Sequence, residues 1–406
     1  MTKLSYHLQT YKSKAGENGN DSFLISMSVS VCALVFAVLL VESVMRIFLP
    51  IFGEESFSVK KDNAIFSPDP IITNKLKPNK EFGHDKNGFK NEKMLDSYKV
   101  VALGDSHTYG GLRKTPWTQY LAKELGTMVY NMGVAGYGMA QYYYLLNQAL
   151  SFGPDHLIIA LYLGNDIYNA YDVVYHNQGW EKFQKNDFVD TAPQTIIDHG
   201  KIKGQLLGDI RLWIRGHSYL YRFVSDRTRG IREWLGLALP WHTGTRDWTH
   251  PHPDAVLCYK EKPEIATCFW NGHRLRGLDL SNKNTREGLR LTKEFLKRMS
   301  DKTKDMGSIL VIALLPTKQM AYREVVGAYG GQNEYYTSII KNEIEIKEEL
   351  KKWCQIHDIF CIDIAPSMQK MLRERKQLYP NSIDDHPTQA GYRLYAKTIA
   401  EYLKHR

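Results

Sequence analysis

Short apolar runs alternate with amphipathic stretches along residues 98–166 and again along residues 285–403. The short runs have the length and the nearly continuous apolar character of strands buried on both faces. They cover residues 98–103, 128–132, 156–163, 308–315 and 359–362. The amphipathic stretches predict helices, at residues 116–125, 140–150, 285–304, 341–357 and 388–403. This alternation predicts an α/β domain in which helices cover both faces of a parallel sheet.

Two segments lack this alternation. Residues 48–97 are rich in Pro, Asn, Lys and Asp and predict a stalk, parts of which could lie against the domain through Phe82 and Phe89. Residues 167–284 predict an insertion between sheet elements, within a domain that spans residues 98–406. The insertion holds six tryptophans, which line a sugar or lipid site or simply pack an irregular subdomain: Trp180, Trp213, Trp234, Trp241, Trp248 and Trp270.

Residues 23–41 form a run of 19 residues without charge or proline. This length is close to what a helix needs to cross a bilayer. The polar leader at residues 1–22 is long and no small-residue cleavage site follows, so the pattern favours a retained anchor at residues 23–47 over a cleaved signal peptide or a buried soluble helix. Lysines precede the run and acidic residues follow it, which predicts a cytoplasmic N-terminus. We therefore expect a single-pass membrane protein with its domain outside the cytoplasm, which in a bacterium means the inner membrane and a periplasmic or extracellular domain.

The cysteines fit an oxidising compartment. Apart from Cys32 in the apolar run, they form two close pairs, and we expect bridges between Cys258 and Cys268 and between Cys354 and Cys361. Two buried free thiols are the alternative for the second pair. Neither pair has Cys-x-x-Cys spacing, so we expect no metal site and no cofactor.

With 43% hydrophobic residues, a chain of 406 residues can bury a large core. Its net charge of +9 is diffuse, without a long basic run or a nucleic-acid motif. A solvated basic surface is therefore favoured over binding to anionic lipid or glycan, and no nucleic-acid partner is expected.

Small and polar residues follow the first three predicted strands. Gly104, Asp105 and Ser106 form a strand-to-helix turn, at which a serine beside outward-pointing amides is a candidate nucleophile. Gly136 and Asn165 follow the next two strands. Because strand ends of a doubly wound sheet converge on one crevice, we expect these residues to meet there.

A candidate base lies before the last predicted helix. His386 follows two aspartates, and a carboxylate that orients the imidazole completes a Ser-His-Asp triad. Asp384 is our choice for that carboxylate, since two residues of separation let it turn back to the ring. Asp385 is the rival.

With these blocks in view, the chain resembles the SGNH subfamily of GDSL esterases and lipases. The matching motifs are Gly-Asp-Ser at 104–106, Asn-Met-Gly-Val-Ala-Gly-Tyr at 131–137, Gly-Asn-Asp at 164–166 and Asp-Asp-His-Pro at 384–387. The anchor and Leu-Pro-Thr-Lys at 315–318 further resemble membrane-anchored SGNH proteins of bacteria.

The resemblance implies a flavodoxin-like α/β/α sandwich and a division of roles among five residues. Ser106 is the nucleophile, His386 the base and Asp384 its partner. The oxyanion hole comes from the Ser106 amide, the Gly136 amide and the Asn165 side chain. The sequence departs from the family pattern at His107, which replaces an apolar residue and is expected to face away from the base.

The predicted function is hydrolysis of short acyl esters, with O-acetyl groups on cell-envelope carbohydrate as the expected substrate. The alternatives are an O-acetyltransferase acting on a polysaccharide and a non-catalytic carbohydrate-binding protein on the same fold. The predicted partners are an acylated carbohydrate or small ester and the membrane; a membrane acyltransferase partner stays open.

Overall fold

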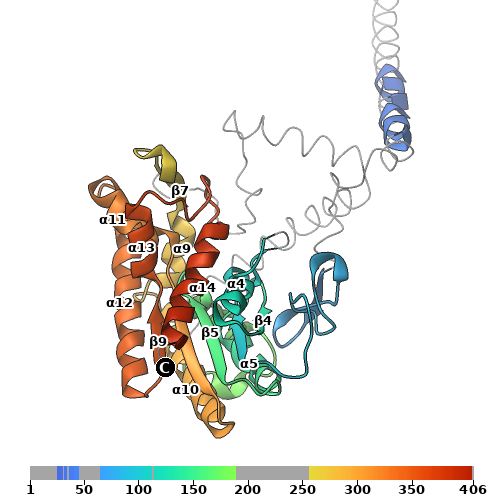
Figure 1. The fold of residues 1–406 in the computed structure, drawn as a ribbon. Helices are drawn as coiled ribbons and strands as arrows, with labels where there is room; N and C mark the ends of the chain where they lie inside the picture. The colour runs from blue at the N-terminus through green and yellow to red at the C-terminus, as the bar shows by residue number, and fades with distance from the viewer. Residues whose placement is uncertain are drawn as a thin grey trace, which may run out of the picture. The chain divides into compact units, whose positions relative to one another are not determined.

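The computed structural model describes residues 25–30, 32–33, 36–44, 65–111, 114–188 and 256–404 (Figure 1). The chain divides into two compact units, one of Asp62–Pro193 with Trp248–Arg406 and one of Met1–Lys61 with Gln194–Asp247. In the second unit the described residues, all between 25 and 44, are helical. The predicted anchor lies only partly within the described residues, and no helix among these is both long and apolar enough to span a bilayer.

The first unit is built on a parallel five-stranded sheet with the strand order β4-β3-β5-β8-β9. The strands lie within two residues of those predicted: β3 (Val100–Gly104), β4 (Val129–Gly133), β5 (His156–Tyr162), β8 (Ile309–Leu315) and β9 (Phe360–Asp363). The chain leaves β3 for β4 on one side and then crosses to β5 on the other. This reversal is the place where α/β folds bind ligands.

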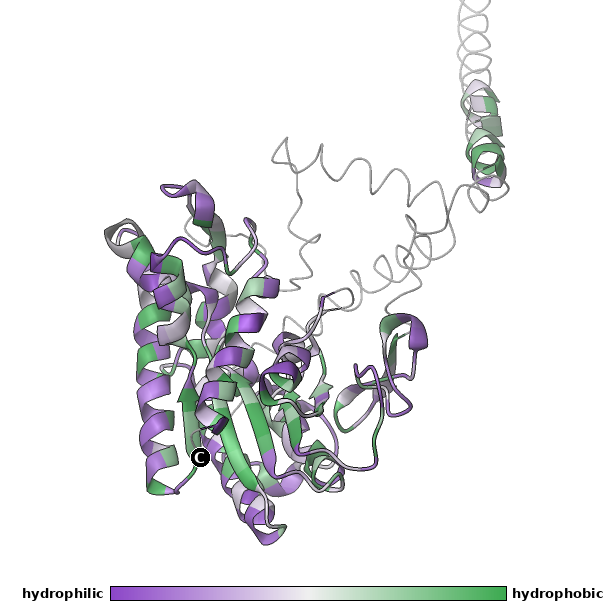
Figure 2. Cartoon of the chain, viewed as in Figure 1, coloured by the Kyte–Doolittle hydropathy of each residue, from purple (hydrophilic) through white to green (hydrophobic). Residues whose placement is uncertain are grey.

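Helices cover both faces of the sheet, because alternate residues of each strand point to opposite sides. On β3, Val101 and Leu103 belong to one hydrophobic core, while Val100 and Ala102 belong to the other. The first core contains residues of α5 (Met139–Leu150), α6 (Asp166–His176), α10 (Lys283–Asp305) and α12 (Glu334–Ile356). The second contains residues of α4 (Trp117–Leu125), α11 (Lys318–Gly330), α13 (Ala365–Arg373) and α14 (Gln389–Lys404). In Figure 2 the apolar strands accordingly lie between helices with polar outer surfaces.

Three of these helices, α6, α11 and α13, are absent from the pattern predicted above, and α12 begins seven residues earlier. The helix α6 falls at the start of the range 167–284, yet it packs on α10 and α5 as part of the α/β layers. Its buried residues Ile167, Ala170, Tyr171 and Val174 follow helical spacing. Their aromatic and β-branched neighbours, including Tyr168 and Val173, hide that spacing in the sequence.

The C-terminal part of the predicted insertion is described from residue 256 onward. It forms an antiparallel hairpin of β6 (Val256–Tyr259) and β7 (Thr267–Trp270), followed by α9 (Asn271–Leu278). A disulfide joins Cys258 to Cys268, which face each other in the hairpin, as the sequence predicted. Of the six tryptophans, Trp180 is buried in the first core. Trp213, Trp234, Trp241 and Trp248 lie outside the described residues.

The second predicted bridge is not formed. Cys354 and Cys361 are free thiols in the structure. Cys354, near the end of α12, is fully buried in the first core, and Cys361 on β9 packs against the same core. Both therefore act as small apolar side chains between a helix and the sheet, which is the alternative left open for this pair.

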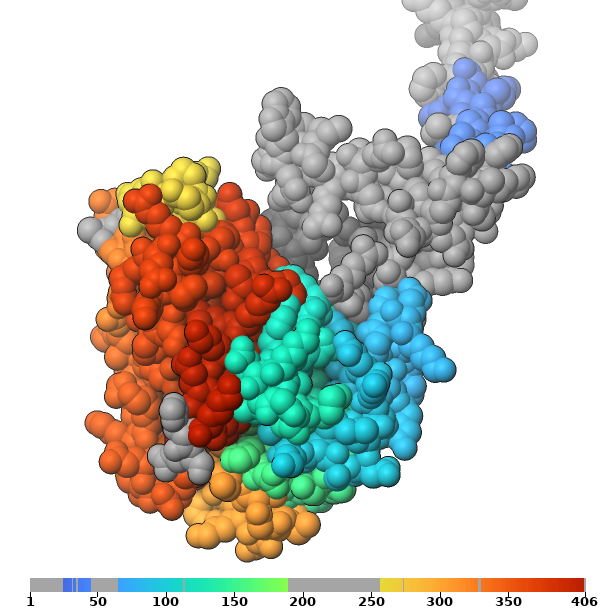
Figure 3. All heavy atoms as spheres, viewed as in Figure 1, coloured from blue at the N-terminus to red at the C-terminus, as the bar shows by residue number. Residues whose placement is uncertain are grey.

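Residues 65–97 of the predicted stalk, which we call the lead-in, are part of the first unit (Figure 3). It forms the antiparallel pair β1 (Phe66–Asp69) and β2 (Thr73–Leu76) and buries both Phe82 and Phe89. His84 Nε2 and the Tyr109 hydroxyl are 2.8 Å apart, which ties the lead-in to the turn after β3. This segment therefore supports the edge of the sheet at which Ser106 lies.

Candidate active site

Ser106 lies on the turn that leads from β3 into the one-turn helix α3 (Ser106–Tyr109). Asp105 caps this helix, because its Oδ1 accepts a hydrogen bond of 2.8 Å from the amide of His107. Position 104, directly before Asp105, requires glycine, since a Cβ there would lie 2.0 Å from Thr108 Oγ1. The tight packing of this turn thus presents the Ser106 hydroxyl at the carboxyl end of the sheet.

His386 lies between Ser106 and Asp384. Its Nε2 is 2.9 Å from Ser106 Oγ, and its Nδ1 is 2.7 Å from Asp384 Oδ1. The Asp384 carboxylate can only accept, which assigns the ring proton to Nδ1 and leaves Nε2 to accept from the serine hydroxyl. Asp384 Oδ1 also accepts from the main-chain N–H of His386 at 3.0 Å. This is the geometry of a nucleophile, a base and an orienting carboxylate.

The surrounding carboxylates control the protonation of His386. Burial by itself lowers the pKa of His386, but the hydrogen bond to Asp384 and the negative charges of Asp385 and Asp384 outweigh it, so the pKa lies above its ordinary value. For Asp384, burial acts upward and the hydrogen bonds to His386 prevail, so its pKa lies below the usual range. At neutral pH the pair is therefore a carboxylate beside an imidazole that readily takes up a proton.

Asp385 has a different partner. Its Oδ2 accepts from Arg274 Nε at 2.5 Å and forms an ion pair with the same guanidinium. Both side chains are largely buried, and the guanidinium lies 5.0 Å from the centre of the Tyr162 ring. Burial acts to raise the pKa of Asp385, but the charge of Arg274 holds it far below the usual range. The two adjacent aspartates therefore differ in role, and only Asp384 hydrogen-bonds the imidazole.

Sequence reasoning did not find Arg274. It lies on α9, inside the segment assigned to the insertion, and no spacing relates it to the Asp-Asp-His-Pro motif more than 100 residues later. Its Nη1 also donates to the carbonyl oxygen of Gly164 at 3.4 Å. The side chain thus connects the loop of His386 with the turn after β5.

The three predicted oxyanion residues follow three adjacent strands. The ends of β3 and β4 are level, since Gly104 pairs with Gly133, whereas β5 continues past Ala160, the partner of Gly104, to Tyr162. Gly136 has a φ of +82°, which suits glycine. Asn165 is the residue before α6, and its side chain makes no capping hydrogen bond to that helix. Its Oδ1 is buried without a hydrogen-bond partner among the described residues. The oxygen of this side chain therefore has no structural role in capping α6.

Asp166, the last residue of Gly-Asn-Asp, holds the turn that carries Asn165. Its Oδ2 accepts from the amide of Tyr162 at 2.8 Å and from the Tyr142 hydroxyl at 2.9 Å. Burial and the nearby charge of Asp105 raise the pKa of Asp166 well above its ordinary value. Burial also raises the pKa of Asp105 to about 6. The carboxyl group beneath the turn therefore holds its proton more tightly than an ordinary aspartate does.

His107 lies where the sequence analysis did not expect it. The ring is 1% exposed, stacks on Tyr162 with centroids 3.9 Å apart, and lies 5.0 Å from the His386 ring. The expectation that it faces away from the base is therefore wrong. The reason is the first turn of α3, which aims residue 107 across the sheet end at Tyr162. Burial, together with the charge of His386, lowers the pKa of His107 well below its ordinary value, so the ring is neutral.

Asp384, Asp385 and His386 also form a group of possible metal ligands, with ligand atoms within 4.8 Å of one another. Their existing partners do not fit a cation. Arg274 already neutralises Asp385, and both ring nitrogens of His386 have partners. The donor set is thus arranged for proton transfer rather than for ion binding.

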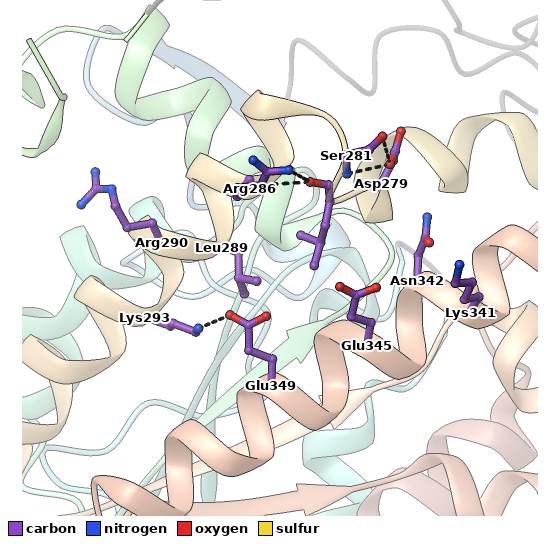
Figure 4. A pocket seen from close by; sticks show the side chains of 11 residues that line it. Asp279, Ser281, Arg286, Leu289, Arg290, Lys293, Lys341, Asn342, Glu345 and Glu349 are labelled. Atoms are coloured by element: carbon purple, nitrogen blue, oxygen red, sulfur yellow. Dashed lines mark hydrogen bonds and ion pairs between the residues drawn. The ribbon is translucent and has the colours of Figure 1, made fainter. Parts of the chain in front are cut away.

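A separate cavity of about 630 Å³ lies between α10 and α12 (Figure 4). None of the triad residues lines it. Two of its cationic side chains are already engaged, since Lys293 pairs with Glu349 and Arg290 with Glu287. The candidate catalytic residues therefore lie at the carboxyl ends of the strands and not in this cavity.

Similar solved structures are known, although no protein-family model and no curated protein matches the chain. A protein from Desulfitobacterium hafniense described as lipolytic and of the G-D-S-L family is 14% identical, with 75% of this chain and 99% of that chain covered and a TM-score of 0.35. A GDSL-like lipase from Parabacteroides merdae is 13% identical, with 77% and 100% covered and a TM-score of 0.35. A catalytic mutant of an acetylxylan esterase from Geobacillus stearothermophilus is 10% identical, with 76% and 94% covered and a TM-score of 0.35. The descriptions of the first two proteins name the GDSL family, and that of the third names an acetylxylan esterase.

Proposed function

We propose that the protein is a serine esterase that hydrolyses short acyl esters. One observation carries the proposal: His386 bridges Ser106 Oγ at 2.9 Å and Asp384 Oδ1 at 2.7 Å, at the carboxyl ends of the strands. Surface serine and histidine side chains seldom lie in such a chain of hydrogen bonds with an orienting carboxylate unless they react.

In the proposed reaction, Ser106 Oγ attacks the ester carbonyl carbon while its proton passes to His386 Nε2. The imidazolium that forms is stabilised by Asp384 through Nδ1. The carbonyl oxygen becomes an oxyanion, for which the amides of Ser106 and Gly136 and the side chain of Asn165 are the proposed donors. Each such donor contributes about 3 to 4 kcal/mol to the transition state.

Collapse of the tetrahedral intermediate expels the alcohol, which takes the proton from His386, and leaves an acyl-serine. Water then attacks the acyl carbon and gives a proton to the same nitrogen. The second collapse releases the carboxylic acid and returns the proton to Ser106. One imidazole therefore serves both half-reactions, and no step requires a metal or a redox group.

For the substrate we propose O-acetyl groups on cell-envelope carbohydrate. The predicted anchor would hold the domain close to the envelope, outside the cytoplasm. The disulfide between Cys258 and Cys268 supports that compartment, because disulfides persist in oxidising environments. A C-terminal reporter that is active only in the cytoplasm would contradict the placement.

The test uses the full chain purified in detergent. We expect it to release p-nitrophenol from p-nitrophenyl acetate and to react at Ser106 with a fluorophosphonate. Ser106→Ala should abolish both signals, while Ser281→Ala, which changes an exposed serine of the cavity between α10 and α12, should keep them. If the wild-type chain shows neither signal and leaves an acetylated oligosaccharide intact, the proposal fails.

A further inference from the structure

Lys318 lies three residues after β8 and is 1% exposed, although it carries an ammonium group. Its Nζ lies within hydrogen-bond distance of four main-chain carbonyl oxygens. The three nearest are those of Ser382 at 2.7 Å, Cys268 at 3.0 Å and Asp384 at 3.0 Å, and that of Pro380 is at 3.4 Å. An ammonium group has three N–H donors. Each donor can therefore have a carbonyl partner, so the group is fully satisfied in the interior.

The surroundings of Lys318 also suit a cation. Its Nζ lies 5.9 Å from the ring centre of Phe269 and 5.7 Å from that of Tyr379, distances at which an aromatic face attracts positive charge. Burial lowers the pKa of Lys318 to about 8, while the charges of Asp385 and Asp384 act in the opposite direction. The side chain is thus mainly protonated at pH 7 and keeps all three donors.

The three carbonyl groups belong to two segments far apart in the sequence. Cys268 lies on the hairpin closed by the disulfide, whereas Ser382 and Asp384 lie on the loop that carries His386. Further bonds connect the same two segments. Thr267 Oγ1 donates to the carbonyl oxygen of Pro380 at 2.8 Å, and the Cys268 amide donates to that of Ser382 at 3.4 Å. Lysine, hairpin and loop therefore form one hydrogen-bonded unit.

This unit also binds the main chain of the residue that carries the orienting carboxylate. Lys318 holds the carbonyl of Asp384, and the Asp384 amide donates to Ser382 Oγ at 3.2 Å. The main-chain N–H and C=O of Asp384 are thus both hydrogen-bonded, while its side chain hydrogen-bonds to His386. The loop itself lacks regular secondary structure between α13 and α14, so its position depends on such bonds.

We infer that Lys318 is a positioning residue for the triad, holding the loop of Asp384 and His386 against the disulfide-closed hairpin so that the imidazole faces Ser106. Lys318 acts through main-chain carbonyls and does not touch the reacting atoms. The inference rests on the proposed function for its kinetic consequence, but its structural part can be tested separately.

The kinetic test compares Lys318→Met with Lys318→Arg in the full chain, with turnover counted per Ser106 that reacts with the fluorophosphonate. Displacements of about 1 Å at a reacting centre cost on the order of 10²-fold in rate, and we expect a fall of that order in kcat for Lys318→Met with little change in KM. Lys318→Arg keeps charge and donors and should recover part of the loss. Lys293→Met, which removes an ion-paired lysine of α10, is the control. An unchanged kcat per labelled site in Lys318→Met overturns the inference.

The disulfide supplies a second, independent variant. Cys258→Ala with Cys268→Ala should lower kcat in the same direction, because the hairpin then holds the loop less firmly. Combined with Lys318→Met, the loss should be smaller than the product of the two separate losses, since both act through one unit. Independent, multiplicative losses overturn the inference. If Lys318→Met does not fold, the cysteine variant alone decides, and a wild-type kcat in it counts against the inference.

Hydrogen exchange separates this inference from the esterase proposal. Peptides covering residues 380–388 should exchange faster in Lys318→Met and in the cysteine variant than in the wild type. Unchanged exchange contradicts the proposed clamp, by which Lys318 and the hairpin hold the loop of Asp384 and His386, whatever the activity. Faster exchange in a protein whose wild type neither hydrolyses esters nor reacts with the fluorophosphonate leaves the clamp intact and removes the proposed function.

Discussion

Asp385 and Arg274 form a largely buried ion pair, with Asp385 Oδ2 2.5 Å from Arg274 Nε, directly beside the residue that orients His386. Of the two adjacent aspartates, Asp385 thus pairs with the permanent charge of Arg274, whereas Asp384 pairs with His386, which becomes a cation during the proposed reaction. Their loss should therefore have different consequences.

Asp384→Asn should lower kcat by about 10⁴, as loss of the triad carboxylate does in other serine hydrolases, with a small effect on thermal unfolding because Asp384 is half exposed. Asp385→Asn should reduce turnover per labelled Ser106 much less. Steady-state kinetics normalised by active-site labelling measures both. Equal losses of turnover in the two variants would mean that the geometry does not assign the roles.

Asp385→Asn should instead destabilise the protein by about 3 to 5 kcal/mol, because it leaves the Arg274 guanidinium buried without its carboxylate. Replacing both partners, as Arg274→Met with Asp385→Leu, should restore part of this stability, since no buried charge then lacks a partner. Denaturant unfolding of the wild type, both single variants and the double variant closes the cycle. A double variant less stable than either single variant would contradict the prediction.

The pH dependence of kcat/KM should report His386, which acts only in its neutral form. Its pKa is raised above the ordinary histidine value by Asp384 and Asp385 despite burial. The kcat/KM should therefore rise with pH around a midpoint above about 6.5, the unperturbed histidine pKa. Below this midpoint His386 is protonated and the activity should fall. In Asp385→Asn one source of negative charge is gone, so the acid limb should move to lower pH. A limb that moves to higher pH would exclude His386 as the titrating base.

His107 should make the protein less stable in acid. Burial holds the pKa of His107 in the folded state well below 6.5. Below about pH 6.5 the unfolded chain therefore binds a proton that the folded chain does not. The free energy of unfolding consequently decreases as the pH is lowered. The stability difference between wild type and His107→Leu should consequently shrink or reverse from pH 7 to pH 5. Unfolding curves at the two pH values test this, and a constant difference would show that the pKa of His107 is the same in the folded and the unfolded chain.

The cysteines should be distinguishable by mass. In denaturant without reductant, alkylation should label Cys32, Cys354 and Cys361, the free thiols, and reduction should add Cys258 and Cys268. A single label before reduction would show that Cys354 and Cys361 are bridged.

The alternating pattern of the sequence was enough to predict the parallel sheet and five of its helices, because strands buried on both faces must be apolar throughout and amphipathic helices must turn one stripe toward them. The small and polar residues after the predicted strands also indicated that the candidate site lies at the carboxyl ends of the sheet. Ser106, Gly136 and Asn165 could be expected to meet because the carboxyl ends of parallel strands lie at one edge of the sheet whatever the details of packing. Asp384 and His386 were proposed from the motif before the last helix and from the family resemblance.

What the tertiary structure decided concerns partners that no local pattern encodes. Arg274 meets Asp385, and Lys318 meets the carbonyls of Ser382 and Asp384, across sequence separations of 64 residues or more. The burial of His107 against Tyr162 and the free state of Cys354 likewise depend on which side chains the packed layers bring together. Spacing along a chain determines which residues share a face of a helix or strand, but only the packing of distant elements determines which charges meet in the interior.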